Sequence, residues 1–310
     1  MRSPSYRPVG RCIYCGSDGQ LGGLGREHIF AFSFGGTLVL PKSSCKRCEA
    51  ITRSFEQKCA REMFGKLRIL FNLPTQHKGQ RPTELPLEIQ LDGRIQTIML
   101  PISDYPAVPI IFPIFNPPGI LCGVSPTEVF WNSRTFPVFP NLLDNKARLA
   151  RLRAKIGRPF NLSLRYQTPI GPFTRMLAKI AHANAVAEFG IDGFDRLLPP
   201  IILGESKCTP HYVGCIDAMP AMASPEFADG THRLFFSLAT VEIKNKSGSI
   251  VSRTTYLGAA IRLFKDMGSP TYFVVIGTPS RDTLQSLEEG ALPGGQLRSD
   301  DITLFRFPED

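Results

Sequence analysis

Two Cys-x-x-Cys pairs constrain this chain more than any other feature of its sequence. They are Cys12–Cys15 and Cys45–Cys48, and 29 residues lie between them. Four thiolates at this spacing can close a tetrahedral zinc site. A zinc ion held by four cysteines has no open coordination position, so it would hold the fold together and would not activate water. The alternative is that the four residues are ordinary buried thiols without a metal.

The start of the chain bears on its compartment. The segment MRSPSYRPVGRC carries positive charge but no apolar run follows it, and no window of eighteen residues is uninterruptedly apolar. We therefore expect neither a signal peptide nor a membrane anchor, and no membrane partner. Without export the eight cysteines would stay reduced, and reduced thiolates bind metal more often than they form disulfides. The expected compartment is the cytoplasm.

Positive charge is concentrated at the N-terminal end. The chain holds 36 Lys and Arg against 27 Asp and Glu, a net charge of +9. Residues 1–61 hold ten Lys and Arg against four Asp and Glu, so +6 of that excess lies there. Four zinc-bound thiolates would reduce this figure to about +4. Such a bias is expected of a module that faces a phosphate backbone, with DNA as the expected partner and RNA not excluded.

Hydrophobic periodicity predicts an α+β fold. A helix over 51–73 follows the second cysteine pair and ends at Pro74, and alternating segments around Asp92-Gly93 predict a β-hairpin over 85–100. Further predicted elements are helices over 141–156 and 172–189 and strands over 127–138, 232–244, 249–261 and 271–276. The predicted organisation is a module of residues 1–75 and an α+β domain of residues 76–310, which allows an internal boundary near 100–120, where prolines recur.

Between the cysteine pairs lies Arg26-Glu27-His28-Ile29-Phe30, followed by Gly35-Gly36. This arrangement resembles the HNH endonuclease family, in the branch with a (D/E)-H-I core, a downstream Gly-Gly turn and a zinc ribbon made by flanking Cys-x-x-Cys pairs. The resemblance covers residues 12–56, about a seventh of the chain. A weaker likeness to the downstream domain of bacterial proteins of this kind continues over 175–190. The resemblance implies an N-terminal ββα-metal module, treble-clef-like, and an endonuclease that hydrolyses phosphodiester bonds of DNA with a divalent metal.

The chemistry of the motif can be stated from its residues. Phosphodiester hydrolysis needs a base that deprotonates water and a cation that neutralises charge on the phosphate. Adjacent residues on a strand point to opposite faces, so Glu27 and His28 suit divided tasks better than one shared metal. The resemblance implies that His28 is the general base and that Glu27 is a ligand of Mg²⁺ or Mn²⁺.

A single-metal site needs a further protein ligand, which the family usually takes from the start of the helix after the second cysteine pair. Glu49 stands there in place of the family's Asn or His, and Glu56 lies two turns along the same helix face, so either acid can complete the site. The family's middle Asn has no clear counterpart, because Thr37 is the only polar residue in the corresponding segment. The candidate phosphate contacts are Arg26, Lys46, Arg47 and Arg53.

Each of these residues also has a structural interpretation, as a solvated charge or as a histidine satisfied by the backbone. Two other functions therefore stay open. One is a non-catalytic nucleic-acid-binding module with a degenerate metal site, and the other is a protein-interaction platform built on the zinc unit. On the helix over 172–189, the residues Arg175, Lys179 and His182 share one face and are expected to be structural. The sequence predicts no oligomeric state.

Overall fold

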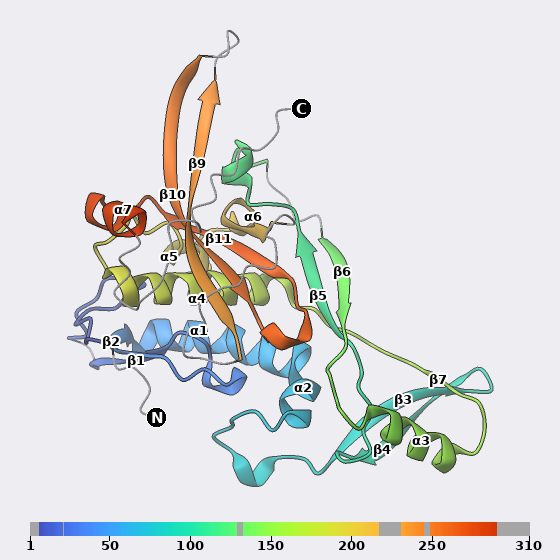
Figure 1. Cartoon of the computed structure of the whole chain (residues 1–310). Coiled ribbons are helices and arrows are strands. Elements are labelled where there is room, and N and C mark those ends of the chain that lie inside the picture. Colours follow the sequence, from blue (N-terminus) through green and yellow to red (C-terminus); the bar gives the residue numbers. More distant parts are fainter. Residues whose placement is uncertain (1–5, 21, 129–132, 217–230, 245–248, 290–310) are drawn as a thin grey trace.

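The computed structural model describes residues 6–20, 22–128, 133–216, 231–244 and 249–289. It is a mixed α+β fold in which the helix α4 (Ile170–Phe189) lies between an N-terminal unit and an antiparallel sheet (Figure 1). The predicted α+β class is confirmed. Within the described ranges, none of the helices has the length and apolar character needed to cross a membrane.

The N-terminal unit is a β-hairpin followed by a helix. β1 (Leu24–His28) pairs antiparallel with β2 (Val39–Cys45), and α1 (Lys46–Lys58) begins directly after β2. A one-turn π-helix, η2 (Cys59–Met63), and then α2 (Gly65–Leu70) follow α1 in the chain. The helix predicted over 51–73 is therefore present, but it begins earlier because the extended Cys45 serves as its N-cap.

The loop between β1 and β2 requires two glycines for two different reasons. Gly35 has a φ of 92°, in the left-handed region where other residues are strained. A Cβ atom on Gly36 would lie 2.1 Å from the carbonyl oxygen of Phe30, so only glycine allows these backbone segments to approach. Together they fold the turn η1 (Phe32–Phe34) back toward β1, where the ring of Phe32 lies 6.0 Å from the ring of His28.

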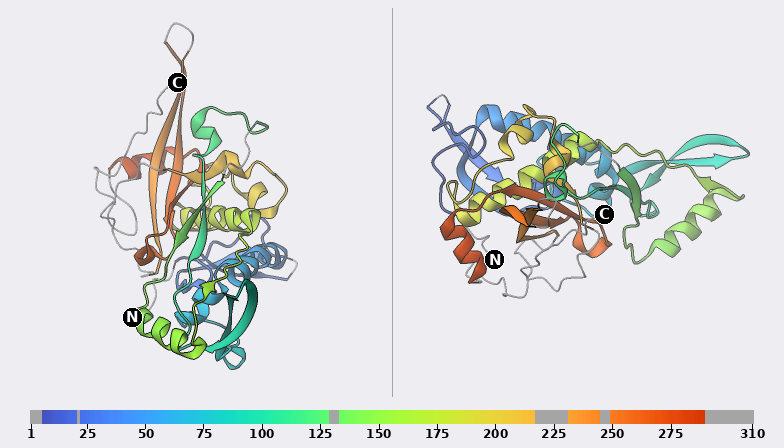
Figure 2. Two further views of the ribbon diagram at one scale, coloured as in Figure 1. Left: turned by 90° about the vertical axis from the view of Figure 1, so that its right-hand side faces the viewer. Right: turned by 90° about the horizontal axis from the view of Figure 1, so that it is seen from above.

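A four-stranded antiparallel sheet packs on the other side of α4. Its order is β8 (Val213–Cys215), β11 (Thr271–Gly277), β10 (Ile250–Arg262), β9 (Arg233–Lys244). β9 and β10 form a long hairpin that extends beyond the body of the molecule (Figures 1 and 2). The predicted strands of this region match the observed ones to within one residue. The sequence also predicts a hairpin loop over 244–248, of which residues 245–248 lie outside the described residues.

The remaining elements surround this body. The short helices are α5 (Pro199–Leu203), α6 (Thr209–Tyr212), α7 (Arg281–Glu288), η3 (Lys78–Gln80), η4 (Gly119–Cys122) and η5 (Lys265–Met267). The segment near 100–120, where prolines recur, contains β5 (Ile110–Phe115), which pairs with β6 (Ser133–Val138). The strand predicted over 127–138 is shorter than expected where it is described, since 126–128 form a turn and 129–132 lie outside the described residues.

A small lobe projects from the body (Figure 2). It contains the predicted hairpin, β3 (Glu84–Leu91) and β4 (Arg94–Pro101), together with β7 (Asn161–Leu162) and α3 (Asn145–Ile156). The hairpin turn is made by Asp92 and Gly93, both at positive φ, as the two-residue turn of a tight hairpin requires. The lobe has a small core of its own, which includes Leu87 and Leu152.

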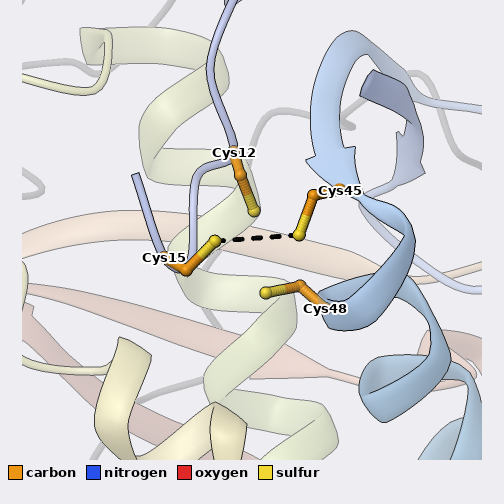
Figure 3. A group of neighbouring side chains, drawn as sticks. All are labelled: Cys12, Cys15, Cys45 and Cys48. Carbon is orange, nitrogen blue, oxygen red and sulfur yellow. Dashed lines mark hydrogen bonds between the residues drawn. The ribbon is translucent and has the colours of Figure 1, made fainter. Parts of the chain in front are cut away.

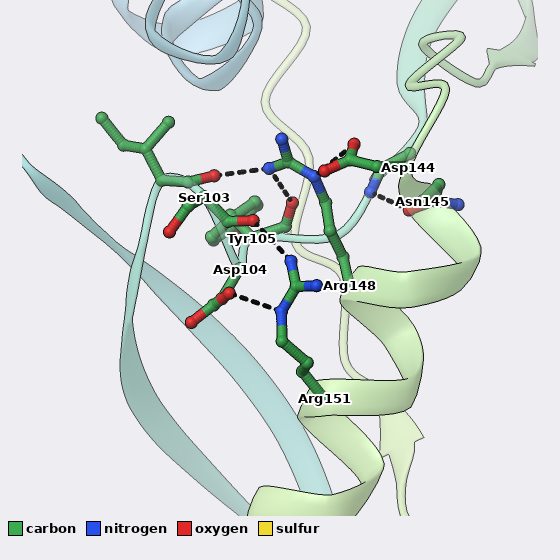
Figure 4. A network of polar contacts seen from close by, with 9 residues as sticks. Ser103, Asp104, Tyr105, Asp144, Asn145, Arg148 and Arg151 are labelled. Carbon is green, nitrogen blue, oxygen red and sulfur yellow. Dashed lines mark hydrogen bonds and ion pairs between the residues drawn. The ribbon is translucent and has the colours of Figure 1, made fainter.

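Two arginines of α3 fasten that helix to the lobe. Arg151 Nε donates to the Asp104 carboxylate at 2.7 Å, and Arg148 Nη1 donates to the carbonyl oxygen of Tyr105 at 3.1 Å (Figure 4). Arg148 also pairs with Asp144 at 2.7 Å. Arg148 and Arg151 of α3 therefore have structural partners within the lobe.

One hydrophobic core joins the N-terminal unit, α4 and the sheet. Aromatic rings run through it: the ring of Phe64 lies 6.3 Å from that of Phe173 on α4, which lies 5.2 Å from that of Tyr272 on β11. The N-terminal unit thus packs on parts of the chain that are distant in sequence. The division into residues 1–75 and 76–310, with a boundary near 100–120, stays a prediction.

Candidate functional site

The four cysteines of the two Cys-x-x-Cys pairs lie together (Figure 3). Their sulfur atoms are all within 4.8 Å of one another, and the Sγ atoms of Cys15 and Cys45 are 3.7 Å apart. Sulfur atoms around a tetrahedral zinc ion at about 2.3 Å would be roughly 3.8 Å apart. The four side chains are therefore positioned to bind a metal ion such as zinc, and the geometry fits a closed structural site.

Local backbone structure presents these thiols. Cys12 and Cys15 lie on a turn in which the Gly16 amide donates to the Cys12 carbonyl at 2.9 Å, with Gly16 at a φ of 77°. Cys45 ends β2 and Cys48 lies in the first turn of α1. Burial raises the pKa of the Cys45 thiol, but hydrogen bonds from the Cys48 backbone and from the neighbouring thiols outweigh burial and lower its pKa overall. A metal here would tie the N-terminal turn to the junction of hairpin and helix.

A cavity of about 600 Å³ lies beside β1 and α1. It brings together six residues that the sequence singles out: Arg26, Glu27, His28, Glu49, Arg53 and Glu56. Lys46 and Arg47 are not among its lining residues, and neither is Thr37. The motif and both candidate acids of the following helix therefore face one space, whereas two of the four candidate phosphate contacts do not.

Two further arginines and a histidine, which the sequence did not single out, also line the cavity. Arg61 and Arg68 come from η2 and α2, and His77 comes from the segment after α2. Arg68 is held by a hydrogen bond from its Nε to the carbonyl oxygen of Ser33 at 2.8 Å. With Arg26 and Arg53, four guanidinium groups line the space, which suits an anionic ligand.

His28 ends β1 and is half-buried at this cavity. Burial lowers the pKa of its imidazole, and the positive charges of Lys179 and Arg26 lower it further. A histidine with a pKa below its ordinary value of 6.5 is neutral near pH 7. Its imidazole therefore has a free lone pair at the pH where a general base would act.

Glu27 lies on the buried side of β1, where it meets a lysine from α4. The ammonium of Lys179 is 2.8 Å from Glu27 Oε1 and 2.8 Å from Glu56 Oε1. It also donates to the backbone carbonyl oxygens of Ile29, at 3.2 Å, and of His28. Burial lowers the pKa of Lys179, but the carboxylates of Glu27 and Glu56 more than offset this and raise its pKa overall. The lysine is therefore charged and neutralises part of the acidic pair.

The divalent cation that the resemblance implies does not fit these acids as they are arranged. Glu27 and Glu56 are paired with Lys179, and Glu49 is paired with Arg53. Among the described residues, the four cysteines are the one group of three or more Cys, His, Asp and Glu side chains close enough to hold a metal together. We therefore route no step of the chemistry through Mg²⁺ or Mn²⁺.

The expected structural face of α4 proves to be the face that meets the N-terminal unit. Besides Lys179, His182 Nε2 lies 2.8 Å from the carbonyl oxygen of Ile13, between the first two cysteines. Arg175 donates to the carbonyl oxygen of Ile202 at 2.6 Å and lies over the ring of Phe55 on α1. The signal for Lys179 was available in the sequence, since it is a lysine within an otherwise apolar, small-residue stretch of a helix. Its partners were not.

Comparison of this chain with protein-family models, with curated proteins and with solved structures finds no match.

Proposed function

We propose that this protein is an HNH-type endonuclease that hydrolyses phosphodiester bonds of DNA, with His28 as the general base. The observation that carries the proposal is the position of His28 on a cavity lined by Arg26, Arg53, Arg61 and Arg68. A neutral imidazole beside four guanidinium groups is what water activation next to a phosphate needs.

The finer description of the N-terminal unit belongs to the same proposal. A cysteine turn, a β-hairpin and a helix, with the second cysteine pair at the junction of hairpin and helix, support a treble-clef-like ββα module. Zinc bound by Cys12, Cys15, Cys45 and Cys48 supplies a structural link between the turn and the helix, and no chemistry.

In the proposed reaction a water molecule attacks the phosphorus atom while His28 takes a proton from that water. One P–O ester bond breaks, and the released sugar oxygen takes a proton from solvent. The guanidinium groups around the cavity neutralise the charge that develops on the phosphate oxygens. The net reaction is hydrolysis, with one strand cut at a time.

The test is cleavage of supercoiled plasmid by the zinc-loaded chain, in Mg²⁺, in Mn²⁺ and in EDTA. The intact protein is expected to nick the plasmid, and His28→Ala is expected to lower the rate by about 100-fold or more. His77→Ala is the matched control, since it removes a second imidazole from the same cavity. Equal rates of nicking by the intact protein and by His28→Ala would contradict the assignment of His28 as the general base.

A second candidate function is non-catalytic binding of nucleic acid at the same cavity. The observation in its favour is that Glu27, Glu49 and Glu56 are already paired with cations of the chain. It predicts salt-dependent DNA binding without nicking in any of the three buffers.

A further inference from the structure

A fully buried lysine lies beneath the candidate site. Lys179 has 0% exposed side-chain surface, and its neighbours along α4 are buried apolar residues. An ammonium ion in such surroundings requires compensating oxygen atoms and negative charge. The side chain does not reach the cavity, so it is not positioned to touch a substrate there.

Four oxygen atoms surround this ammonium. Two are carboxylate oxygens, from Glu27 and Glu56, and two are backbone carbonyl oxygens, from His28 and Ile29. Carboxylate and carbonyl oxygens are also the ligands of hard divalent cations. The carboxylate distances of 2.8 Å suit an ammonium ion, because Mg²⁺ requires oxygens at about 2.0–2.1 Å.

One cation of the chain already lies between the two carboxyl groups of this cage. Burial raises the pKa of Glu56, and the nearby Glu27 adds to this, although Lys179 lowers it, so the two acids carry at most two negative charges against the one positive charge of Lys179. A divalent cation between the same carboxylates would have to displace the ammonium, which is attached to the middle of a helix packed against α1, β10 and β11. The ammonium and a divalent cation would therefore compete for one position.

We propose that Lys179 is the resident cation of the candidate nuclease site. Its ammonium takes the position between Glu27 and Glu56 that a divalent cation would otherwise hold. Lys179 is thus a positioning residue, since it fixes the Glu27 carboxylate and the backbone of His28 from below. The inference rests on the proposed function where it assigns this role toward His28, but the occupancy of the cage can be measured without any substrate.

The experiment is a titration of the zinc-loaded protein with Mn²⁺, in which free Mn²⁺ is followed by its electron paramagnetic resonance signal. We expect the intact chain and Glu27→Gln to bind the same amount of Mn²⁺. We expect Lys179→Met to gain one Mn²⁺ site, and Lys179→Met combined with Glu27→Gln to lose it again. Lys155→Met is the matched control, since it removes an exposed lysine of α3 and should gain no site.

Two results would overturn the inference. One is an equivalent of Mn²⁺ bound by the intact chain and lost in Glu27→Gln, which would make the acids a metal site. The other is a Lys179→Met protein that melts at the temperature of the intact chain without Mn²⁺, which would show that the acids need no cation. If Lys179→Met does not fold, the comparison of the intact chain with Glu27→Gln still decides. Absence of plasmid nicking would count against the proposed function alone, because no nucleic acid is present in this titration.

Discussion

The Nε2 atom of His182 lies 2.8 Å from the carbonyl oxygen of Ile13, inside the first Cys-x-x-Cys pair. Burial lowers the pKa of His182 to about 4, so its imidazole is neutral and this nitrogen donates to the carbonyl. The ring of Tyr14 lies 5.9 Å from the same imidazole. The turn that carries Cys12 and Cys15 is thus held in two ways, by the four-cysteine cluster and by the contact of His182 on α4.

Removal of the metal is expected to destabilise the whole chain, because the turn and the start of α1 would lose their common link. We expect Cys48→Ser to lower the zinc content and to lower the unfolding free energy by about 3 kcal/mol or more, which lowers the melting temperature by roughly 5 °C or more for a chain of 310 residues. Elemental analysis and calorimetry measure both quantities. Cys122→Ser alters an exposed thiol outside the cluster and should retain the metal and the melting temperature. An unchanged zinc content in Cys48→Ser would contradict the four-cysteine site.

Gly36→Ala should be strongly destabilising, because its Cβ would lie 2.1 Å from the backbone oxygen of Phe30. Backbone atoms cannot move away as the end of a flexible side chain can, so we expect a loss of about 3 kcal/mol or more. Gly79→Ala is the control, since nothing lies within 4 Å of a Cβ at that position. Denaturant unfolding of the two variants should separate them clearly. Equal stability of both would mean that the Gly-Gly loop tolerates a side chain.

His232 makes the stability depend on pH. Its ring stacks on Phe30 at 4.6 Å, its Nε2 lies 3.0 Å from the carbonyl oxygen of Phe34, and its Nδ1 accepts from the Phe264 amide at 3.1 Å. This pattern fits a neutral imidazole, and burial lowers its pKa from 6.5 to about 4. At a pH between about 4 and 6.5, His232 therefore binds a proton in the unfolded chain but not in the folded chain.

The sign follows from that difference. The contribution of His232 to stability is fully present above pH 6.5 and is lost as the pH falls toward 4. Between pH 8 and pH 5 we expect the unfolding free energy to fall by about 2 kcal/mol on account of this residue. His232→Gln should remove that part of the slope in urea titrations at the two pH values. A variant with the same acid sensitivity as the intact chain would show that other groups cause it.

Nucleic-acid binding at the cavity should depend on its arginines. Arg26→Ala and Arg61→Ala each remove one exposed cation from the lining, so each should weaken binding uniformly across sequences. The slope of log affinity against log salt should fall in magnitude by about 1 for each phosphate group that the protein no longer neutralises. Fluorescence anisotropy at several salt concentrations measures this. Arg94→Ala, on the projecting lobe, is the control, and an equal change there would mean that binding is spread over the surface.

Features set by neighbouring residues could be predicted from the sequence. The hairpin at Asp92-Gly93 forms because these two residues tolerate positive φ, and the cysteine pairs meet because their spacing suits one metal site. The interruption of the α1 helix by η2 was not predicted, since Cys59 and Ala60 belong to the same apolar pattern as the residues before them. A π-turn changes the phase of a helix without any glycine or proline to mark it.

The sequence predicts the motif of the candidate site, but it does not predict the lysine that pairs with the acids of that site. Glu27, His28 and Glu56 line one cavity because they belong to one hairpin–helix unit, and their roles stay a prediction. Lys179 was not linked to them, since no local rule relates a residue of α4 to a strand 151 positions earlier. Only the packing of α4 against α1 brings the ammonium to the carboxylates.

The distance along the chain between His28 and Lys179 has a consequence during synthesis. A ribosome adds about 5–20 residues per second, so the lysine follows the histidine after roughly 8–30 s. Through that interval the newly made hairpin and helix carry two carboxylates whose counterion does not yet exist, and water must solvate them. A nascent chain released before α4 is made therefore contains every residue of the motif but lacks the setting that would give the motif its shape.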